Sequence, residues 1–157
     1  MMKHKDIVVR SAHKDDLNEL LRLYAHLNPE DADLLPPRSE LAGRWTEMVA
    51  NPMVTTIVAE CEDRLAASCS LTVVPNLTRG ARPFGVIENV ITHPDFRRRG
   101  LASAVIERAI ETAQQADCYK VMLLSSISRT GAHALYEKLG FRRDTKVGFD
   151  LRLEESS

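Results

Sequence analysis

The sequence has few cysteines and no long apolar stretch, and each absence excludes a class of protein. Its three cysteines, Cys61, Cys69 and Cys118, show neither the spacing of metal-binding cysteine pairs nor the even count of a secreted disulfide scaffold. No apolar run approaches the ~20 residues that a membrane-spanning helix requires. We therefore expect reduced cysteines, no bound metal and no membrane association.

Net charge is also nearly absent. A formal charge of −1 gives no general attraction for nucleic acid. Arg97, Arg98 and Arg99 form one local basic cluster, but the interleaved aromatics and wide basic face of a nucleic-acid surface are missing. The amino terminus lacks the apolar core of a signal peptide. We expect a cytoplasmic protein that binds no nucleic acid and uses this cluster for a small anion.

The residues that are present indicate a mixed α/β protein. With 157 residues, 44% of them hydrophobic and 27% charged, the chain is expected to form a single domain over 1–157. β-Branched and apolar segments predict strands at 6–10, 53–60, 65–74, 84–92 and 120–125, the last buried on both faces. Helical spacing predicts helices from a cap at Ser11 to Leu27, and at 39–49, 100–116 and 132–139. Alternating apolar residues predict a closing strand through Val147, Phe149, Leu151 and Leu153.

The loop from Arg97 to Ser103 is the first candidate site. It joins a predicted strand to a predicted helix, so its backbone N–H groups and the helix amino terminus can converge on an anion. Gly100 permits close backbone approach, Ala102 keeps the first turn slim, and the arginines supply bidentate donors to phosphate. A basic helix start without a ligand gives the same spacing.

Four stretches in 86–141 add context to that loop. They are Ile-Glu-Asn-Val-Ile-Thr-His-Pro, Arg-Arg-Arg-Gly-Leu-Ala, Cys-Tyr-Lys-Val-Met-Leu and Leu-Tyr-Glu-Lys-Leu-Gly-Phe. Together they resemble the GNAT superfamily of N-acetyltransferases. The family's acetyl-CoA signature falls on Arg97, Gly100 and Ala102, and its second signature falls on 135–141. The close resemblance covers about a third of the chain.

The resemblance implies a central mixed, splayed, mostly antiparallel β-sheet flanked by helices. The strand at 84–92 should carry a bulge, and its free edge should pair with the pantetheine arm of acetyl-CoA. A backbone N–H near Asn89 or Val90 should then polarise the thioester carbonyl. The expected cofactor-binding residues are Asn89, Val90, Ile91, Thr92, Arg97, Arg98, Arg99, Gly100, Leu101, Ala102, Ser103 and Arg129.

Glu88 is the candidate base. An alkylamine with a pKa near ~10 is almost wholly protonated at neutral pH, so a base that removes its proton contributes to the rate. Ile87, Glu88 and Asn89 resemble the Ile-Glu-Asp pattern of glucosamine-phosphate N-acetyltransferase-like members. The alternative is that Glu88 pairs with a basic group or faces solvent. His93 is a second candidate, and it also fits a turn residue before Pro94.

Tyr136 matches the family's general acid, which protonates the departing CoA thiolate. Its alternative role is to pack the short helix, because Tyr136 and Leu139 share a face. Arg129 stands where family members often carry an asparagine that bonds pantetheine, and its guanidinium has the reach for a CoA phosphate instead. His133 is read as an exposed helical residue.

The resemblance implies direct attack of a primary amine on acetyl-CoA in a ternary complex, with a small-molecule amine as acceptor. One alternative is a protein lysine or N-terminal acetyltransferase, and another is a non-catalytic acyl-CoA-binding regulatory module. The acidic, proline-rich loop at 28–37 either attracts a cationic acceptor or is simply solvated. Analogy with the family also leaves a homodimer open.

Overall fold

The computed structural model describes residues 6–153, and the chain forms two compact units. The first unit ends at Leu123 and the second begins at Leu124. The first carries the sheet, and the second carries one helix and an extended carboxyl-terminal segment. The expectation of a single domain over 1–157 stays a prediction.

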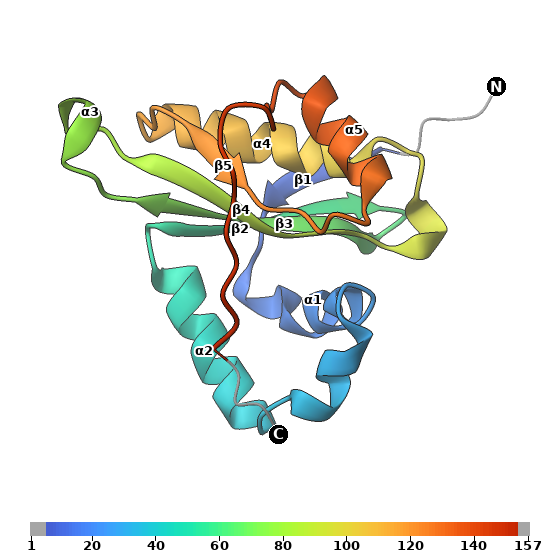
Figure 1. Cartoon of the computed structure of the whole chain (residues 1–157). Coiled ribbons are helices and arrows are strands. Elements are labelled where there is room, and N and C mark those ends of the chain that lie inside the picture. Colours follow the sequence, from blue (N-terminus) through green and yellow to red (C-terminus); the bar gives the residue numbers. More distant parts are fainter. Residues whose placement is uncertain (1–5, 154–157) are drawn as a thin grey trace. The chain divides into compact units, whose positions relative to one another are not determined.

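The sheet of the first unit follows the order of the chain. Antiparallel pairs join β1 to β2, β2 to β3 and β3 to β4, and β5 runs parallel to β4 at the edge (Figure 1). This mixed, mostly antiparallel sheet is the one expected from the resemblance. The strands in the described residues are β1 Val8–Ser11, β2 Val54–Cys61, β3 Arg64–Val74, β4 Phe84–Thr92 and β5 Val121–Leu123.

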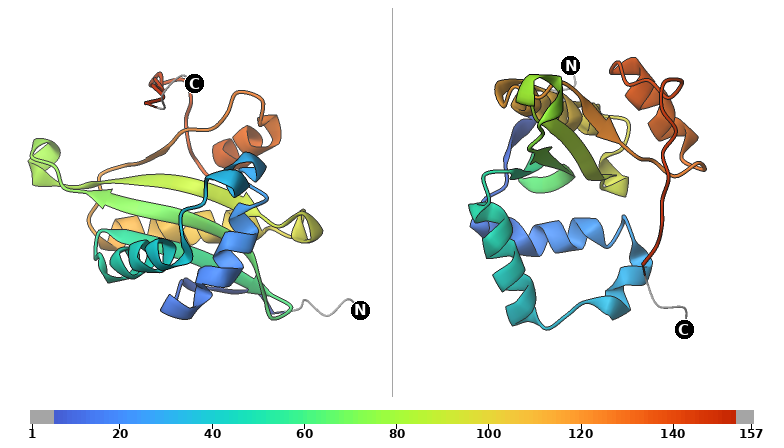
Figure 2. Two further views of the ribbon diagram at one scale, coloured as in Figure 1. Left: turned by 90° about the horizontal axis from the view of Figure 1, so that it is seen from below. Right: turned by 60° about the vertical axis from the view of Figure 1, so that its left-hand side comes forward.

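Helices cover both faces of this sheet. One face carries α4, and the opposite face carries α1 and α2 (Figure 2). The Glu62–Asp63 turn between β2 and β3 has positive φ at both residues, as a tight hairpin connection requires. The helical segments of the first unit are η1 Lys14–Asp16, α1 Leu17–Tyr24, η2 Pro29–Leu34, α2 Arg38–Ala50, α3 Thr78–Ala81, η3 Pro94–Phe96 and α4 Leu101–Gln115.

The core on the α1 side joins helices and strands through large apolar side chains. Leu20, Trp45, Val58 and Leu65 form one buried cluster. The Trp45 indole N–H donates to the Lys14 carbonyl at 2.9 Å, so the one polar atom of this ring is satisfied. Each large side chain buried in this way stabilises the fold by about 1.5–3 kcal/mol.

The α4 side depends on a close approach of the helix to β4. A Cβ atom placed on Gly85 would lie 3.1 Å from Leu71 Cδ1 and 3.3 Å from Val121 Cγ2, with Ala113 of α4 next at 3.5 Å. A side chain at this position would require Leu71 of β3 and Val121 of β5 to shift by a few tenths of an ångström, whereas the distance to Ala113 is an ordinary contact. The buried residues of α4 are Leu101, Val105, Ile106, Ala109 and Ala113.

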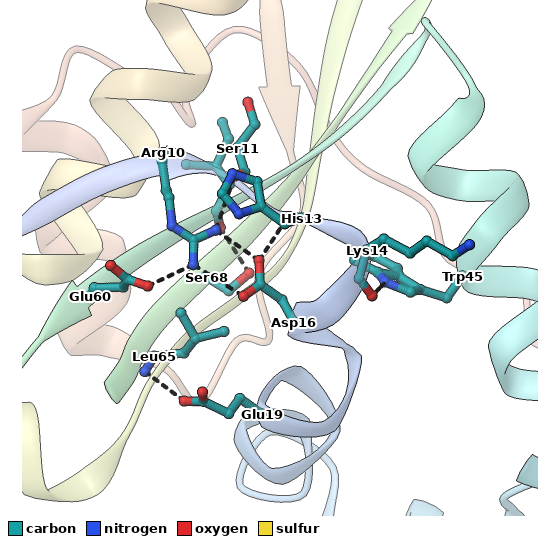
Figure 3. A network of polar contacts seen from close by, with 11 residues as sticks. Arg10, Ser11, His13, Lys14, Asp16, Glu19, Trp45, Glu60, Leu65 and Ser68 are labelled. Carbon is teal, nitrogen blue, oxygen red and sulfur yellow. Dashed lines mark hydrogen bonds and ion pairs between the residues drawn. The ribbon is translucent and has the colours of Figure 1, made fainter. Parts of the chain in front are cut away.

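An ionic cluster ties β1 to η1 and β2 (Figure 3). The Arg10 guanidinium donates to both carboxylate oxygens of Asp16, at 2.7 and 3.0 Å, and to Glu60 at 2.6 Å. Burial by itself would raise the pKa of Asp16, but the hydrogen bonds from Arg10 and from the His13 backbone N–H hold that pKa below its usual value. The cluster therefore favours the ionised carboxylate.

The second unit is built around α5, Thr130–Lys138. Gly140 follows the helix with a φ of 96°, so it ends the helix as the sequence predicts. Tyr136 is 6% exposed and makes an edge-to-face contact with Phe141, with ring centroids 6.1 Å apart.

Three sequence predictions need correction. The closing strand is wrong: Val147, Phe149, Leu151 and Leu153 are 78–90% exposed, and no described residue of their unit pairs with them as a strand. An alternating pattern marks a strand only where a neighbour accepts its backbone hydrogen bonds. The last described residues of the chain therefore form no ladder.

The other corrections are local. β5 is not buried on both faces, because it is an edge strand and Met122 is 45% exposed. Ser11 is no helix cap, since it ends β1 opposite Ile57. His13 precedes η1 instead, and its backbone N–H donates to Asp16 at 2.5 Å.

Candidate active site

β4 carries an irregularity at its centre. Ser70 of β3 pairs with Glu88, whereas Ser68 pairs with Ile91, so Asn89 and Val90 together face a single residue of β3. Asn89 has a φ of 54°, in the left-handed region that a bulge uses. The bulge expected in this strand is confirmed.

The second half of β4 has an open edge in the first unit. β5 pairs only with Gly85, Val86 and Ile87. From Glu88 to Thr92, no β5 residue in the described sheet accepts or donates a ladder bond. This is the splay expected from the resemblance, and an extended ligand chain can add along such an edge.

Glu88 lies at the start of that open edge. Its side chain is exposed, and its carboxylate has no hydrogen-bond or ion-pair partner among residues 6–153. Glu88 thus forms no structural ion pair with the described residues, and its exposure fits the other alternative, a side chain that faces solvent. The carboxylate remains available to act on a ligand.

The sheet face that holds Glu88 also holds a buried hydroxyl group that the sequence did not indicate. Ser70, directly opposite Glu88, is 8% exposed, and its Oγ has no hydrogen-bond partner in the described chain. Tyr24 of α1 approaches Ser68 and Ser70, and burial raises the pKa of Tyr24 above its usual value although both hydroxyls act in the opposite direction. Tyr24 and Ser70 lie close to each other without a hydrogen bond between them.

The loop before α4 has the conformation of an anion cradle. Arg98 and Gly100 both have left-handed φ angles, 63° and 76°. Within residues 6–153 no side chain caps α4, so the first N–H groups of this 15-residue helix point out of its end. A Cβ on Gly100 would meet no protein atom within 4 Å, which leaves the approach to the backbone open. These features fit a pyrophosphate.

The three arginines of the loop differ in their surroundings. Arg99 donates to Glu62 at 2.9 Å and lies 5.0 Å over the Phe96 ring, so its side chain is directed to the β2–β3 turn. Arg97 and Arg98 are exposed. Their side chains are therefore better placed than that of Arg99 to reach a phosphate.

The remaining candidates have structural contacts of their own. His93 Nδ1 accepts the Asp95 N–H at 3.1 Å, which fits its interpretation as a turn residue. In the second unit, Arg129 precedes α5 and is exposed. His133 lies 2.8 Å from the Ser126 carbonyl and is half-buried, so the expectation of an exposed residue is wrong.

Comparison with known proteins shows which family the chain belongs to. The model of the acetyltransferase (GNAT) family matches residues 17–141. This chain belongs to that family. It is therefore a GNAT N-acetyltransferase, and the superfamily resemblance read from 86–141 is confirmed.

Individual proteins that are similar to this chain agree with the family match. A glucosamine 6-phosphate N-acetyltransferase from Trypanosoma brucei brucei is 36% identical over 140 residues, which cover 87% of this chain and 90% of that protein. A solved structure from Agrobacterium tumefaciens str. C58 is 43% identical and has a TM-score of 0.85. The match covers 92% of this chain and 99% of that one. The N-alpha-acetyltransferase MAK3 of Arabidopsis thaliana is 36% identical over 63 residues, 40% of this chain and 33% of that protein.

The described residues contain neither a membrane-spanning helix nor a cluster of metal-binding side chains. None of the helices in residues 6–153 is both long and apolar enough to cross a membrane. Among the same residues, no group of three or more histidine, cysteine, aspartate or glutamate side chains is placed to hold a metal ion.

Proposed function

We propose that this enzyme transfers the acetyl group of acetyl-CoA to the primary amine of a small molecule by direct attack in a ternary complex. The observation that carries the proposal is the unpartnered Glu88 carboxylate, which lies next to the Asn89 bulge and at the start of the open β4 edge. A base, a backbone donor and an edge for an extended ligand are thereby brought together within one strand.

Acetyl-CoA would be held by backbone groups more than by side chains. The N–H groups of the loop around Gly100 and of the first turn of α4 receive the pyrophosphate, with Arg97 and Arg98 supplying charge. The edge from Asn89 to Thr92 pairs with the pantetheine arm. Arg129 is assigned to a CoA phosphate.

The transfer step then uses three groups of the chain. Glu88 takes a proton from the ammonium group, directly or through water, and the free amine attacks the thioester carbonyl carbon. A backbone N–H near Asn89 or Val90 stabilises the oxyanion, a contribution of ~10² to 10³ in rate. Formation of the C–N bond turns the thioester carbonyl into the oxyanion, and the nitrogen releases its second proton to solvent. The C–S bond breaks as the oxyanion collapses to the amide carbonyl, and Tyr136 protonates the departing thiolate.

The first acceptor to test is an amino sugar phosphate. The Trypanosoma brucei brucei relative is named for glucosamine 6-phosphate, and the match spans most of both chains. The corresponding strand motif here has Asn89 where the pattern carries Asp. Release of CoA thiol from acetyl-CoA should therefore be measured with glucosamine 6-phosphate, glucosamine, polyamines, amino acids and peptides. Release with one small amine supports the proposal, and binding of acetyl-CoA without release in any case points to a regulatory module.

A second candidate is N-terminal or lysine acetylation of a protein. The match to an N-alpha-acetyltransferase favours it, although that match covers 40% of this chain. Leu34 and Leu35 lie within the acidic segment 28–37, are 75% and 54% exposed, and offer apolar contacts for a peptide. Turnover of peptides above that of every small amine would establish this alternative. The cytoplasmic location, the homodimer and the lack of nucleic-acid binding stay predictions.

A further inference from the structure

A cavity of about 410 Å³ lies in the first unit between α1 and the adjoining ends of β3 and β4. Its floor is apolar, because Leu23 and Leu65 are buried there. Its rim is polar and comes from three separate segments. None of the rim side chains has a role in the proposed acetyl transfer. They are Glu19, Arg22, His26, Arg64 and His93.

Two hydrogen-bond donors meet at this rim. His93 Nδ1 accepts the Asp95 N–H, so the proton of the neutral ring is on Nε2. Nε2 lies 3.5 Å from Nη2 of Arg64, which is also a donor. Neither group can satisfy the other, whereas an oxygen acceptor placed between them would satisfy both. The contact geometry therefore favours an anionic ligand.

The neighbours hold these two donors in place. The Arg64 guanidinium lies 5.3 Å over the Phe96 ring, and the His93 ring makes an edge-to-face contact with His26, with centroids 4.6 Å apart. The His93 side chain is only 15% exposed. A ligand would therefore meet a largely pre-formed site.

The charges at the rim of the cavity also favour an anionic ligand. Glu19 is its only carboxylate, and Oε2 of Glu19 accepts the Leu65 backbone N–H at 3.1 Å. The Arg22 guanidinium has no partner among the described residues. Burial and the proximity of His26 lower the pKa of His93, and Arg64 acts in the same direction. An anion in the cavity would reverse that shift.

We propose that this cavity binds a phosphate-class oxyanion, either inorganic phosphate or a phosphate monoester, at a site separate from the acetyl-transfer centre. His93 follows Glu88 by five positions, which is at most about 16 Å of extended strand at about 3.3 Å per residue, and the Asn89 bulge shortens that span. Glu88 does not line the cavity, and none of the residues that do is used in the proposed acetyl transfer. The proposal therefore assigns the oxyanion to a second ligand.

The test is a titration of the histidine ring signals by NMR in the full chain without CoA, so it is independent of turnover. Inorganic phosphate and glucose 6-phosphate, which has no amine, are added separately against sodium chloride at equal ionic strength. We expect a saturable shift of the His93 and His26 signals and a rise in the pKa of His93. Saturation by phosphate alone identifies a free-phosphate site, and tighter binding of the sugar phosphate identifies a monoester site.

Variants locate the site. Arg64→Gln and, independently, Arg22→Gln should weaken oxyanion binding about tenfold or more, because each removes a charged hydrogen-bond donor. Arg22 is exposed and unpaired, so its replacement tests the site even if Arg64→Gln perturbs the packing on Phe96. Arg44→Gln, which removes an equal charge from exposed α2, should bind as wild type. The proposal is overturned if the histidine signals respond to phosphate no more than to chloride, or if all three variants bind alike.

The charged and titratable groups around His93 come from α1 and the turn after it, from β3, and from the segment that follows β4. They are Glu19, Arg22, His26, Arg64, Asp95 and Arg97.

Discussion

Ser70 of β3 lies directly opposite Glu88 of β4, at the last regular pair before the bulge. Beyond this pair, the β4 backbone turns through the left-handed Asn89 and leaves its far edge without a strand partner in the described sheet. A carboxylate, a distorted backbone and an open edge thus occur within a few residues. That relationship underlies the role proposed for Glu88.

Glu88→Gln should lower kcat by ~10² or more and change its pH dependence, because glutamine cannot accept the proton of the ammonium group. The Kd for acetyl-CoA should stay close to that of wild type. Steady-state kinetics from pH 6 to about pH 9, with calorimetric CoA binding, would check this. Glu111→Gln, on the exposed face of α4, serves as the matched control. Unchanged kcat in Glu88→Gln would remove this residue from the mechanism.

Gly100→Val should weaken acetyl-CoA binding about tenfold or more. Gly100 has a φ of 76°, and a side chain in that conformation costs about 1–2 kcal/mol and crowds the approach to the loop backbone. Gly43→Ala is the control, because Gly43 lies in α2 with no atom within 4 Å of an added Cβ. That change should stabilise the helix slightly without altering CoA affinity. Equal affinity in both variants would show that the anion site lies elsewhere.

Tyr136→Phe should lower kcat by more than any loss of folded protein at the assay temperature explains. Phenylalanine keeps the edge-to-face contact with Phe141 but cannot donate a proton to the thiolate. A thermal melt and a kcat measurement on the same preparation separate the two roles. If the variant keeps full turnover, Tyr136 only packs α5, which is the alternative that the sequence left open.

Asp16→Asn should destabilise the fold by about 1–3 kcal/mol at neutral pH, because it removes a charge-assisted contact with Arg10. The pKa of Asp16 is lowered by folding, so the stabilisation is present above the unfolded pKa of about 3.9 and is lost as the pH falls below it. Urea unfolding at pH 7 and near pH 3 measures both parts. Asp33→Asn, in exposed η2, should neither lower the stability nor change its pH dependence. If Asp16→Asn loses the same stability at both pH values, the loss does not come from the ionised carboxylate.

The sequence predicted most of the sheet, and the misses have physical causes. The strand Phe84–Thr92 was predicted with its observed bounds, because a β-branched and apolar run is a local signal. The alternation from Val147 to Leu153 failed because a strand also needs a neighbour, which no local pattern supplies.

Some features of the candidate site were likewise predicted from the sequence, and others were missed. The family motifs placed Glu88 and Gly100 on a bulged strand and an uncapped helix. The buried Ser70 hydroxyl and the Arg64–His93 contact were missed, because both join residues far apart in the sequence. Such contacts depend on the register of the strands, which cannot be predicted from a single sequence.

The most direct test is the rate of CoA thiol release from acetyl-CoA with glucosamine 6-phosphate, compared with glucosamine, polyamines, amino acids and peptides at equal concentration. We predict saturable release with a small amine and ~10² or more slower release in Glu88→Gln. Acetyl-CoA binding with no release to any small amine, or release to peptides alone, would contradict the proposed function.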